Sequence, residues 1–152
     1  MAKISDVIKQ LELLSQYIPI AKSLNVSEAW RIPENYIDNP KCFPNSEFPG
    51  VYIFTDKNAN ILYIGKASSG LGSRIGNGYL GRNRVRKSDK IINAHYLYTV
   101  KLNWEEFFLA PAIEEYLISE LDPSGNKIGR RRDVFKLKPK SPIVDNLKID
   151  AC

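Results

Sequence analysis

The sequence predicts a small mixed fold of the α/β (α+β) class, with helices and a few short strands. Three stretches predict it: an apolar helical stripe near the N-terminus, two apolar runs within 50–65 joined by turn-forming residues, and an alternating run at 91–102. With 152 residues, of which 43% are hydrophobic, the chain is long enough to bury one core. We therefore expect one main domain with a short addition.

Composition limits the compartment and the class of protein. No apolar run approaches the length of a membrane span, and the N-terminus lacks the apolar region of a secretory signal. The two cysteines, Cys42 and Cys152, are too few for a disulfide scaffold and lack the spacing of metal ligands. We expect a soluble cytoplasmic protein without a membrane partner.

The N-terminal stripe predicts an amphipathic helix that Ser5 could cap and Pro19 would end. Its apolar residues are Ile4, Val7, Ile8, Leu11, Leu14 and Ile18. The favoured expectation is that this stripe packs on the chain's own core, because amphipathic helices usually do. A second copy or another protein could instead bind through residues 1–32. A second helical segment is predicted over 27–32, followed by a proline-punctuated connection at 33–48.

Two strands are predicted at 50–55 and 61–65, with the turn residues of 56–60 between them. This pattern indicates a β-hairpin. Tyr52 and Tyr63 share a face only if their pairing sum is odd, which requires an even number of loop residues, such as Asn58-Ala59, or a bulge. Ordinary strand packing would also account for two tyrosines here.

The next stretch, 68–81, contains five glycines without the spacing of a nucleotide-binding loop. A short helix at 71–79 could carry Arg74. A third strand is then predicted over 91–102, with Asn93, His95, Thr99 and Lys101 on its polar face. His95, the single histidine, has no located partner and is left out of the candidate site.

A last helix, beginning near Trp104 or Pro111 and ending at Leu121, separates two neighbouring carboxylates. Glu114 shares its face with Leu117, Ile118 and Leu121, whereas Glu115 does not. A carboxylate on the inward face is unfavourable unless it is paired or binds a metal, although a partly exposed Glu114 paired with a lysine or arginine is the alternative. Asn126 follows the turn at 122–125, where its amide could fasten that turn near Glu114.

Positive charge is concentrated in two stretches. The net charge is +5, yet residues 1–48 hold five basic side chains against six acidic ones. Residues 66–90 and 127–140 each hold seven basic side chains against one acid. Such clusters favour nucleic acid, because neutralised phosphates release counterions, although a solvated basic face would look the same. The candidate contacts are Arg82, Arg84, Arg86, Lys87, Arg130, Arg131 and Arg132.

The ordered set Gly50-Val51-Tyr52, Tyr63-Ile64-Gly65, Arg74, Glu114 and Asn126 resembles the GIY-YIG nuclease family over about half of the chain. The ending Glu114-x-x-Leu117-Ile118 with Pro123 and Asn126 is similar to the excision-repair branch. Arg74 follows Tyr63 by eleven residues, where that branch usually has ten, so we expect one extra residue in the 68–70 stretch.

The resemblance implies a three-stranded, mostly antiparallel sheet with flanking helices, and an N-terminal helical extension added to it. It implies domains at 1–48 (extension and loop), 49–140 (nuclease) and 141–152 (tail). It also implies hydrolysis of a nucleic-acid phosphodiester, with DNA favoured, to a 5′-phosphate and a 3′-hydroxyl. The catalytic set is Tyr52, Tyr63, Lys66, Arg74, Glu114 and Asn126.

Glu114 would bind Mg²⁺ or Mn²⁺, and Arg74 would hold the scissile phosphate. Tyr52 is the first candidate for the general base, with Lys66 lowering its pKa, and Tyr63 is the second. Two alternatives stay open: a module that binds nucleic acid without cleaving it, and a nuclease that acts only with a partner.

Overall fold

The computed structural model of the chain describes residues 1–18, 24–32, 43–78, 91–126 and 139. None of the described helices is long and apolar enough to cross a membrane. The elements follow one another as α1 (Ile4–Ser15), β1 (Trp30–Arg31), β2 (Gly50–Thr55), β3 (Ile61–Ala67), α2 (Leu71–Gly78), β4 (Tyr96–Lys101), the 3₁₀ helix η3 (Trp104–Leu109) and α3 (Ala110–Leu121).

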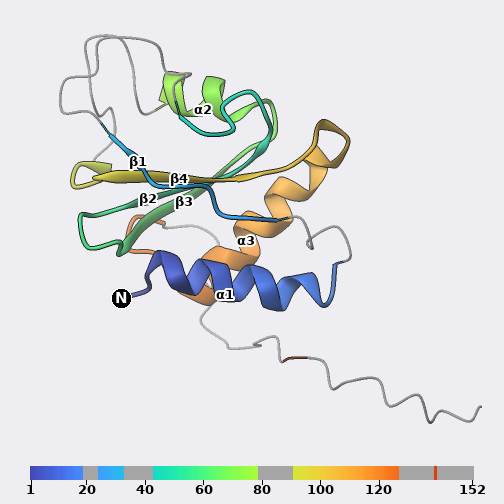
Figure 1. Cartoon of the computed structure of the whole chain (residues 1–152), viewed down its shortest axis with the longest axis horizontal. Helices are drawn as coiled ribbons and strands as arrows, with labels where there is room; N and C mark the ends of the chain where they lie inside the picture. Colours follow the sequence, from blue (N-terminus) through green and yellow to red (C-terminus); the bar gives the residue numbers. More distant parts are fainter. Residues whose placement is uncertain (19–23, 33–42, 79–90, 127–138, 140–152) are drawn as a thin grey trace, which may run out of the picture.

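The described strands form one antiparallel sheet in the order β1-β4-β2-β3. Helix α2 lies on one side of this sheet, and α1 and α3 lie on the other (Figure 1). The α+β class and the flanking helices are therefore confirmed, and the sheet has one strand more than the sequence predicted. Strand β2 is central, and all six of its residues are buried.

The additional strand replaces the helical segment predicted over 27–32, and that prediction is wrong. The backbone N–H of Ser27 donates to Thr99 O at 2.8 Å, and that of Ile32 donates to His95 O at 2.9 Å. Trp30 and Arg31 pair with β4 between these two bonds. The backbone of this segment therefore forms hydrogen bonds with β4 instead of helical hydrogen bonds within the segment. A helix of six residues with little apolar periodicity is too short to compete with this strand pairing.

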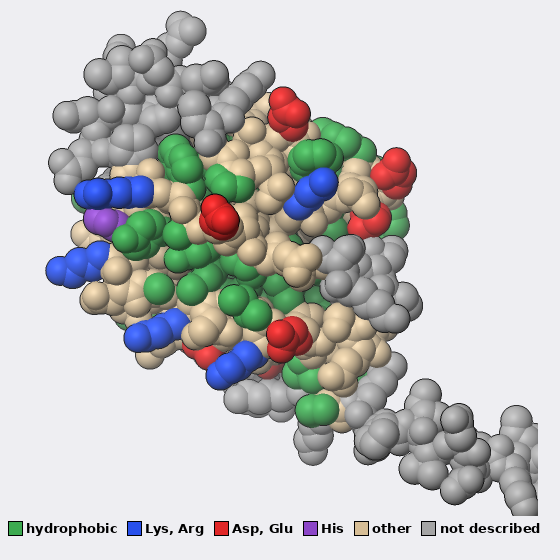
Figure 2. Space-filling model, in the orientation of Figure 1, with side chains coloured by type: hydrophobic (Ala, Val, Ile, Leu, Met, Phe, Trp, Pro, Cys, Tyr) green, Lys and Arg blue, Asp and Glu red, His purple; other side chains and the backbone are tan. Residues whose placement is uncertain are grey.

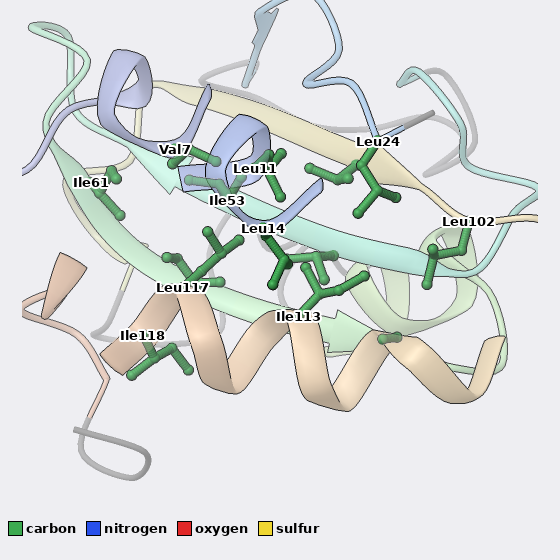
Figure 3. Packing of buried hydrophobic residues seen from close by; sticks show 14 residues of the cluster. Val7, Leu11, Leu14, Leu24, Ile53, Ile61, Leu102, Ile113, Leu117 and Ile118 are labelled. Atoms are coloured by element: carbon green, nitrogen blue, oxygen red, sulfur yellow. The ribbon is translucent and has the colours of Figure 1, made fainter. Parts of the chain in front are cut away.

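Helix α1 packs on the sheet and on α3, as the favoured expectation for its stripe stated. Val7, Leu11 and Leu14 belong to one buried cluster with residues of β2, β3, β4 and α3 (Figure 3). Its start differs from the prediction, because the Asp6 carboxylate, not Ser5, accepts the exposed backbone N–H of Lys3 at 2.8 Å. The helix ends at Ser15, before Pro19.

The hairpin formed by β2 and β3 obtains its register through a bulge. Tyr52 pairs with Gly65 and Phe54 with Tyr63, but Thr55 pairs with Ile61, so β3 carries one extra residue. The loop 56–60 has five residues, an odd number, and the Asp56 carboxylate accepts hydrogen bonds from Asn58 and Asn60 within it. The even-numbered loop is therefore not formed, and the bulge, the other route considered, gives the odd pairing sum that places Tyr52 and Tyr63 on one face.

The third predicted strand is shorter than expected, because regular pairing begins only at Tyr96. Its supposedly polar face is also wrong in part, since Thr99 is completely buried. The Thr99 hydroxyl donates to Pro44 O at 2.9 Å and accepts from Asn45 Nδ2 at 3.1 Å. The chain around 43–49 thus covers this face, which also carries a second apolar cluster with Tyr52, Phe54, Leu71 and Ile75.

Candidate active site

The candidate site lies where β3 ends, between the start of α2 and the middle of α3. Helix α2 is fastened there by its first two backbone N–H groups. That of Leu71 donates to Phe48 O at 2.9 Å, and that of Gly72 donates to Ser46 O at 2.8 Å. A Cβ at position 72 would come within 2.9 Å of Ser46 O, so only glycine permits this approach. This attachment sets the position of Arg74 one turn later.

The two tyrosines lie side by side on the face of the sheet that α2 covers. Their ring centroids are 6.2 Å apart, with an interplanar angle of 34°. Tyr52 is fully buried, with an exposed fraction of 0%, whereas Tyr63 is only partly buried. Of the two phenol side chains, Tyr63 is therefore the one that solvent reaches in this conformation.

Gly65 makes room for Tyr52. The two residues pair across β2 and β3, and a Cβ on Gly65 would fall directly on Cζ and Oη of the Tyr52 ring. The third residue of Tyr63-Ile64-Gly65 must consequently lack a side chain if Tyr52 is to lie flat across β3. In the sequence, Gly65 is recognisable as part of a motif, and the signal for its packing role is its position as a glycine inside a strand.

Glu114 is drawn towards the end of β3. The backbone N–H of Lys66 donates a hydrogen bond to the Glu114 carboxylate, and the Lys66 and Arg74 side chains exert attractive electrostatic interactions on it. Half-burial nevertheless outweighs these attractions, so the pKa of Glu114 is raised above its ordinary value of 4.5. The site thus brings Glu114 to Lys66 and Arg74, which come from a distant part of the sequence.

Asn126 binds the edge of β3 rather than a turn near Glu114. Its Oδ1 accepts from the backbone N–H of Ile64 at 2.9 Å, and its Nδ2 donates to Ile64 O at 2.8 Å. The neighbouring Gly125 N–H donates to Leu62 O at 2.7 Å. Asn126 is only 4% exposed, so this amide satisfies two buried backbone groups that a further strand would otherwise pair. It positions the residue between Tyr63 and Gly65.

The predicted basic contacts, Arg82, Arg84, Arg86, Lys87, Arg130, Arg131 and Arg132, lie outside the described residues. On the described part of the face in Figure 2, basic and acidic side chains are interspersed and form no continuous positive surface. The positive groups that the structure does bring to the site are Lys66 and Arg74.

The site combines two positive side chains with one carboxylate, and Tyr52 and Tyr63 lie on the strands that lead to it. A lysine, an arginine and a half-buried carboxylate are the groups that phosphoryl-transfer enzymes use to hold a phosphate and a cation. An α+β domain with this set therefore has groups that the cleavage of a phosphodiester could use.

Comparison with protein families supports this class and narrows it. The family model described as the UvrC-like GIY-YIG domain matches residues 48–127, which is more than half of the chain. The chain therefore belongs to the GIY-YIG nuclease family. The comparison with curated proteins returns no match.

Proposed function

We propose that this chain is a metal-dependent endonuclease that hydrolyses a phosphodiester of nucleic acid, with DNA as the favoured substrate. The observation that carries the proposal is the convergence of Lys66, Arg74 and the Lys66 backbone N–H on the Glu114 carboxylate. Ionisable groups brought together in this way, with a pKa shifted by burial, are concentrated at functional sites. Family membership independently points to nuclease chemistry.

The residues present fit a divalent cation that is shared with the substrate. Within the described residues no group of three or more His, Cys, Asp or Glu side chains could enclose a metal by itself. Mg²⁺ and Mn²⁺ suit oxygen ligands, and Mg²⁺ is commonly held by one or two carboxylates together with substrate phosphates and water. Glu114 would supply the protein ligand, and the ion would neutralise developing negative charge on the phosphate.

Arg74 and Lys66 would hold the scissile phosphate from the protein side. The guanidinium offers a planar fork of donors that matches two phosphate oxygens, and the ammonium adds a point charge. Both lie close enough to influence the Glu114 carboxylate, so the phosphate would bind between them and the metal ligand. Negative charge that builds up in the transition state is then stabilised by groups already in place.

A tyrosine in its phenolate form would take the proton from the attacking water. The water oxygen then bonds to phosphorus, the bond to the 3′-oxygen breaks, and that oxygen takes up a proton from solvent. The products carry a 5′-phosphate and a 3′-hydroxyl. The order of the motif favours Tyr52 as this base, but its complete burial favours Tyr63 for the contact with water. We propose Tyr63 for that contact, with Tyr52 packed against it in a positioning role.

Phenylalanine substitutions separate these two assignments. If Tyr63 accepts the proton, Tyr63→Phe should lower kcat by about 10²–10⁴-fold, because general-base catalysis contributes about that much. The variant should also lose the rise of kcat with pH that a phenolate base would cause. Tyr52→Phe, which keeps the ring over Gly65, should have a smaller effect. The reverse ranking would return the base to Tyr52 and would mean that substrate binding exposes it.

The function itself is tested by an endonuclease assay on single-stranded DNA, duplex DNA and RNA, with Mg²⁺, Mn²⁺ or a chelator. Cleavage should require metal, and Glu114→Gln should reduce it by about 10²–10³-fold or more. Glu115→Gln is the matched control, since Glu115 is the exposed neighbour on α3. Full activity of Glu114→Gln would refute the assignment, and binding without cleavage would favour a recognition module or a partner-dependent enzyme.

A further inference from the structure

The 3₁₀ helix η3 exposes three aromatic rings. Trp104, Phe107 and Phe108 are 49%, 47% and 59% exposed, and no residue of this six-residue helix is buried. Side chains three apart in a 3₁₀ helix stand one above the other, so Trp104 and Phe107 share a side, and Phe108 lies edge-on to Phe107 with centroids 6.1 Å apart. We call these three residues the aromatic strip. Adjacent exposed apolar side chains of this size usually mark a binding surface.

The aromatic strip is continuous with the candidate active site. The Trp104 ring lies 3.8 Å from the position of a Cβ on Gly70, and Gly70 O accepts the backbone N–H of Arg74 at 3.2 Å. At its C-terminal end, η3 continues directly into α3, which carries Glu114 (Figure 1). The strip therefore lies beside the elements that position the phosphate-binding arginine and the carboxylate.

The two carboxylates on η3 disfavour a phosphate on the aromatic strip itself, so the part of a nucleic acid that could contact the strip is a base. Glu105 and Glu106 lie on the same short helix, and carboxylates repel a phosphodiester backbone. A cleft of about 280 Å³ on another side of η3 is lined by Asn103 and Glu106 together with Lys101, and belongs to a separate surface. Aromatic rings stack on the faces of unpaired bases, and this contact needs no charged group.

We propose that the aromatic strip stacks on unpaired bases next to the scissile phosphate, so that the preferred substrate is nucleic acid with a single-stranded segment at that point. This inference rests on the proposed nuclease function and specifies the substrate of the same site. A regular duplex hides the faces of its bases within the stack, so it would engage the phosphate-binding groups without engaging the strip.

Trp104 provides a direct optical probe of stacking. The only other tryptophan, Trp30, packs edge-on to Phe43. The experiment uses a Trp30→Phe background, so that the fluorescence emission reports Trp104 alone. Glu114→Gln is added to keep the substrate intact. Titration with a twelve-nucleotide oligo-dT in Mg²⁺ should quench Trp104 emission saturably, and a blunt duplex of equal length should quench it much less.

Variants of the strip supply the second readout. Phe107→Ala and Phe108→Ala should each weaken oligo-dT binding about tenfold, the expected effect of one lost base–aromatic contact, and should leave duplex binding unchanged. Ile92→Ala is the matched control, because Ile92 is an exposed apolar residue (57%) outside η3. Circular dichroism confirms that each variant is folded.

The results separate the failure of this inference from the failure of the nuclease assignment. Wild-type cleavage combined with unchanged oligo-dT binding by the strip variants would overturn stacking and leave the nuclease standing. Quenching without any cleavage by the wild-type protein would support stacking and remove the nuclease. Self-association that changes Trp104 emission without nucleic acid, and that Phe107→Ala abolishes, would assign the strip to a second copy and also overturn the inference.

Discussion

Glu114 illustrates how one residue can lower the stability of the free domain while serving its site. Its carboxylate is half-buried on the helix that supplies Ile113, Leu117 and Ile118 to the core. The attraction of Lys66 and Arg74 and the hydrogen bond from Lys66 N–H do not outweigh the loss of hydration, so its pKa is raised. The ionised form is thus less favourable in the folded state than in the unfolded one.

Glu114→Gln should therefore raise the melting temperature at pH 7. The pKa of Glu114 in the folded state lies above the unfolded value of 4.5. The free-energy cost of ionising the buried carboxylate is therefore absent below about pH 4.5 and grows as the pH rises through the folded pKa. The advantage of the variant should shrink as the pH is lowered towards 4.5. Mg²⁺ should stabilise the wild-type protein and not the variant, as measured by thermal unfolding. A less stable variant at pH 7 would contradict this account of Glu114.

Asn126 acts through the backbone it satisfies. Asn126→Ala would leave the N–H and C=O of Ile64 without these partners in a buried position, which costs about 1–3 kcal/mol in the free energy of unfolding. We expect this loss in urea denaturation, accompanied by a lower kcat, because Ile64 lies between Tyr63 and Gly65. The exposed Asn58 provides the control, since Asn58→Ala should change stability by less than about 0.5 kcal/mol.

At the scale of elements, the site depends on how helices and strands are joined. The N-terminal helix is part of this assembly: Ile4 N–H donates to Ala59 O at 3.1 Å, and Ile61 N–H donates to Ala2 O at 2.8 Å. A third link joins the N-terminal helix α1 to α3, because the Tyr116 hydroxyl on α3 donates to Gln10 Oε1 on α1 at 2.6 Å. Helix α1 thus supports both the hairpin that carries the tyrosines and the helix that carries Glu114.

The link between α1 and α3 predicts an alkaline loss of stability. Burial, assisted by the nearby Glu120 and Tyr17, raises the pKa of Tyr116 from 10 to about 12. The folded state therefore retains a proton that the unfolded chain releases first, so the stabilisation is complete below pH 10 and is lost as pH rises towards 12.

Tyr116→Phe should reduce this dependence when denaturant unfolding is measured between pH 9 and 12. Part of the dependence should persist, because burial also raises the pKa of Tyr98. An unchanged slope in Tyr116→Phe would show that the hydroxyl does not titrate with folding. At pH 8 the variant should be less stable by about 0.5–1.5 kcal/mol, the usual contribution of one hydrogen bond.

At the scale of the whole molecule, most of the clustered basic residues lie outside the described elements that form the candidate site. On the face shown in Figure 2 the described residues carry both basic and acidic side chains, while the sequence carries Arg130, Arg131 and Arg132 in a basic stretch outside the described residues. If these arginines contact phosphates, they add affinity that does not depend on sequence and that falls with salt.

Replacing Arg130, Arg131 and Arg132 together by alanine should make the binding of duplex DNA less dependent on salt. The magnitude of the slope of log K, the binding constant, against log salt concentration should fall by about 2–3, because each phosphate contact contributes roughly 0.9. A control with the same change in charge is available in the exposed residues Lys3, Lys9 and Lys57. An equal change in slope for both triple variants would indicate a non-specific charge effect and would exclude a defined contact by the three arginines.

Sequence by itself determined the features that depend on local periodicity. The apolar stripe of α1, the hairpin, the helix that carries Arg74 and the face of α3 that carries Glu114 all follow from spacing within one element. Strict alternation along a strand gave the condition for Tyr52 and Tyr63 to share a face, and the bulge in β3 is what fulfils it. The motif that unites these residues sufficed to indicate the family.

Only the tertiary structure decided the features that depend on partners far away in the chain. The segment at 27–32 became extended because β4 offered it hydrogen bonds, and Thr99 became buried because residues 43–49 covered it. The burial of Tyr52, the attachment of Asn126 to Ile64 and the raised pKa of Glu114 likewise arise from contacts between elements. Local sequence cannot determine these features, because desolvation and long-range hydrogen bonding depend on which surfaces meet when the chain folds.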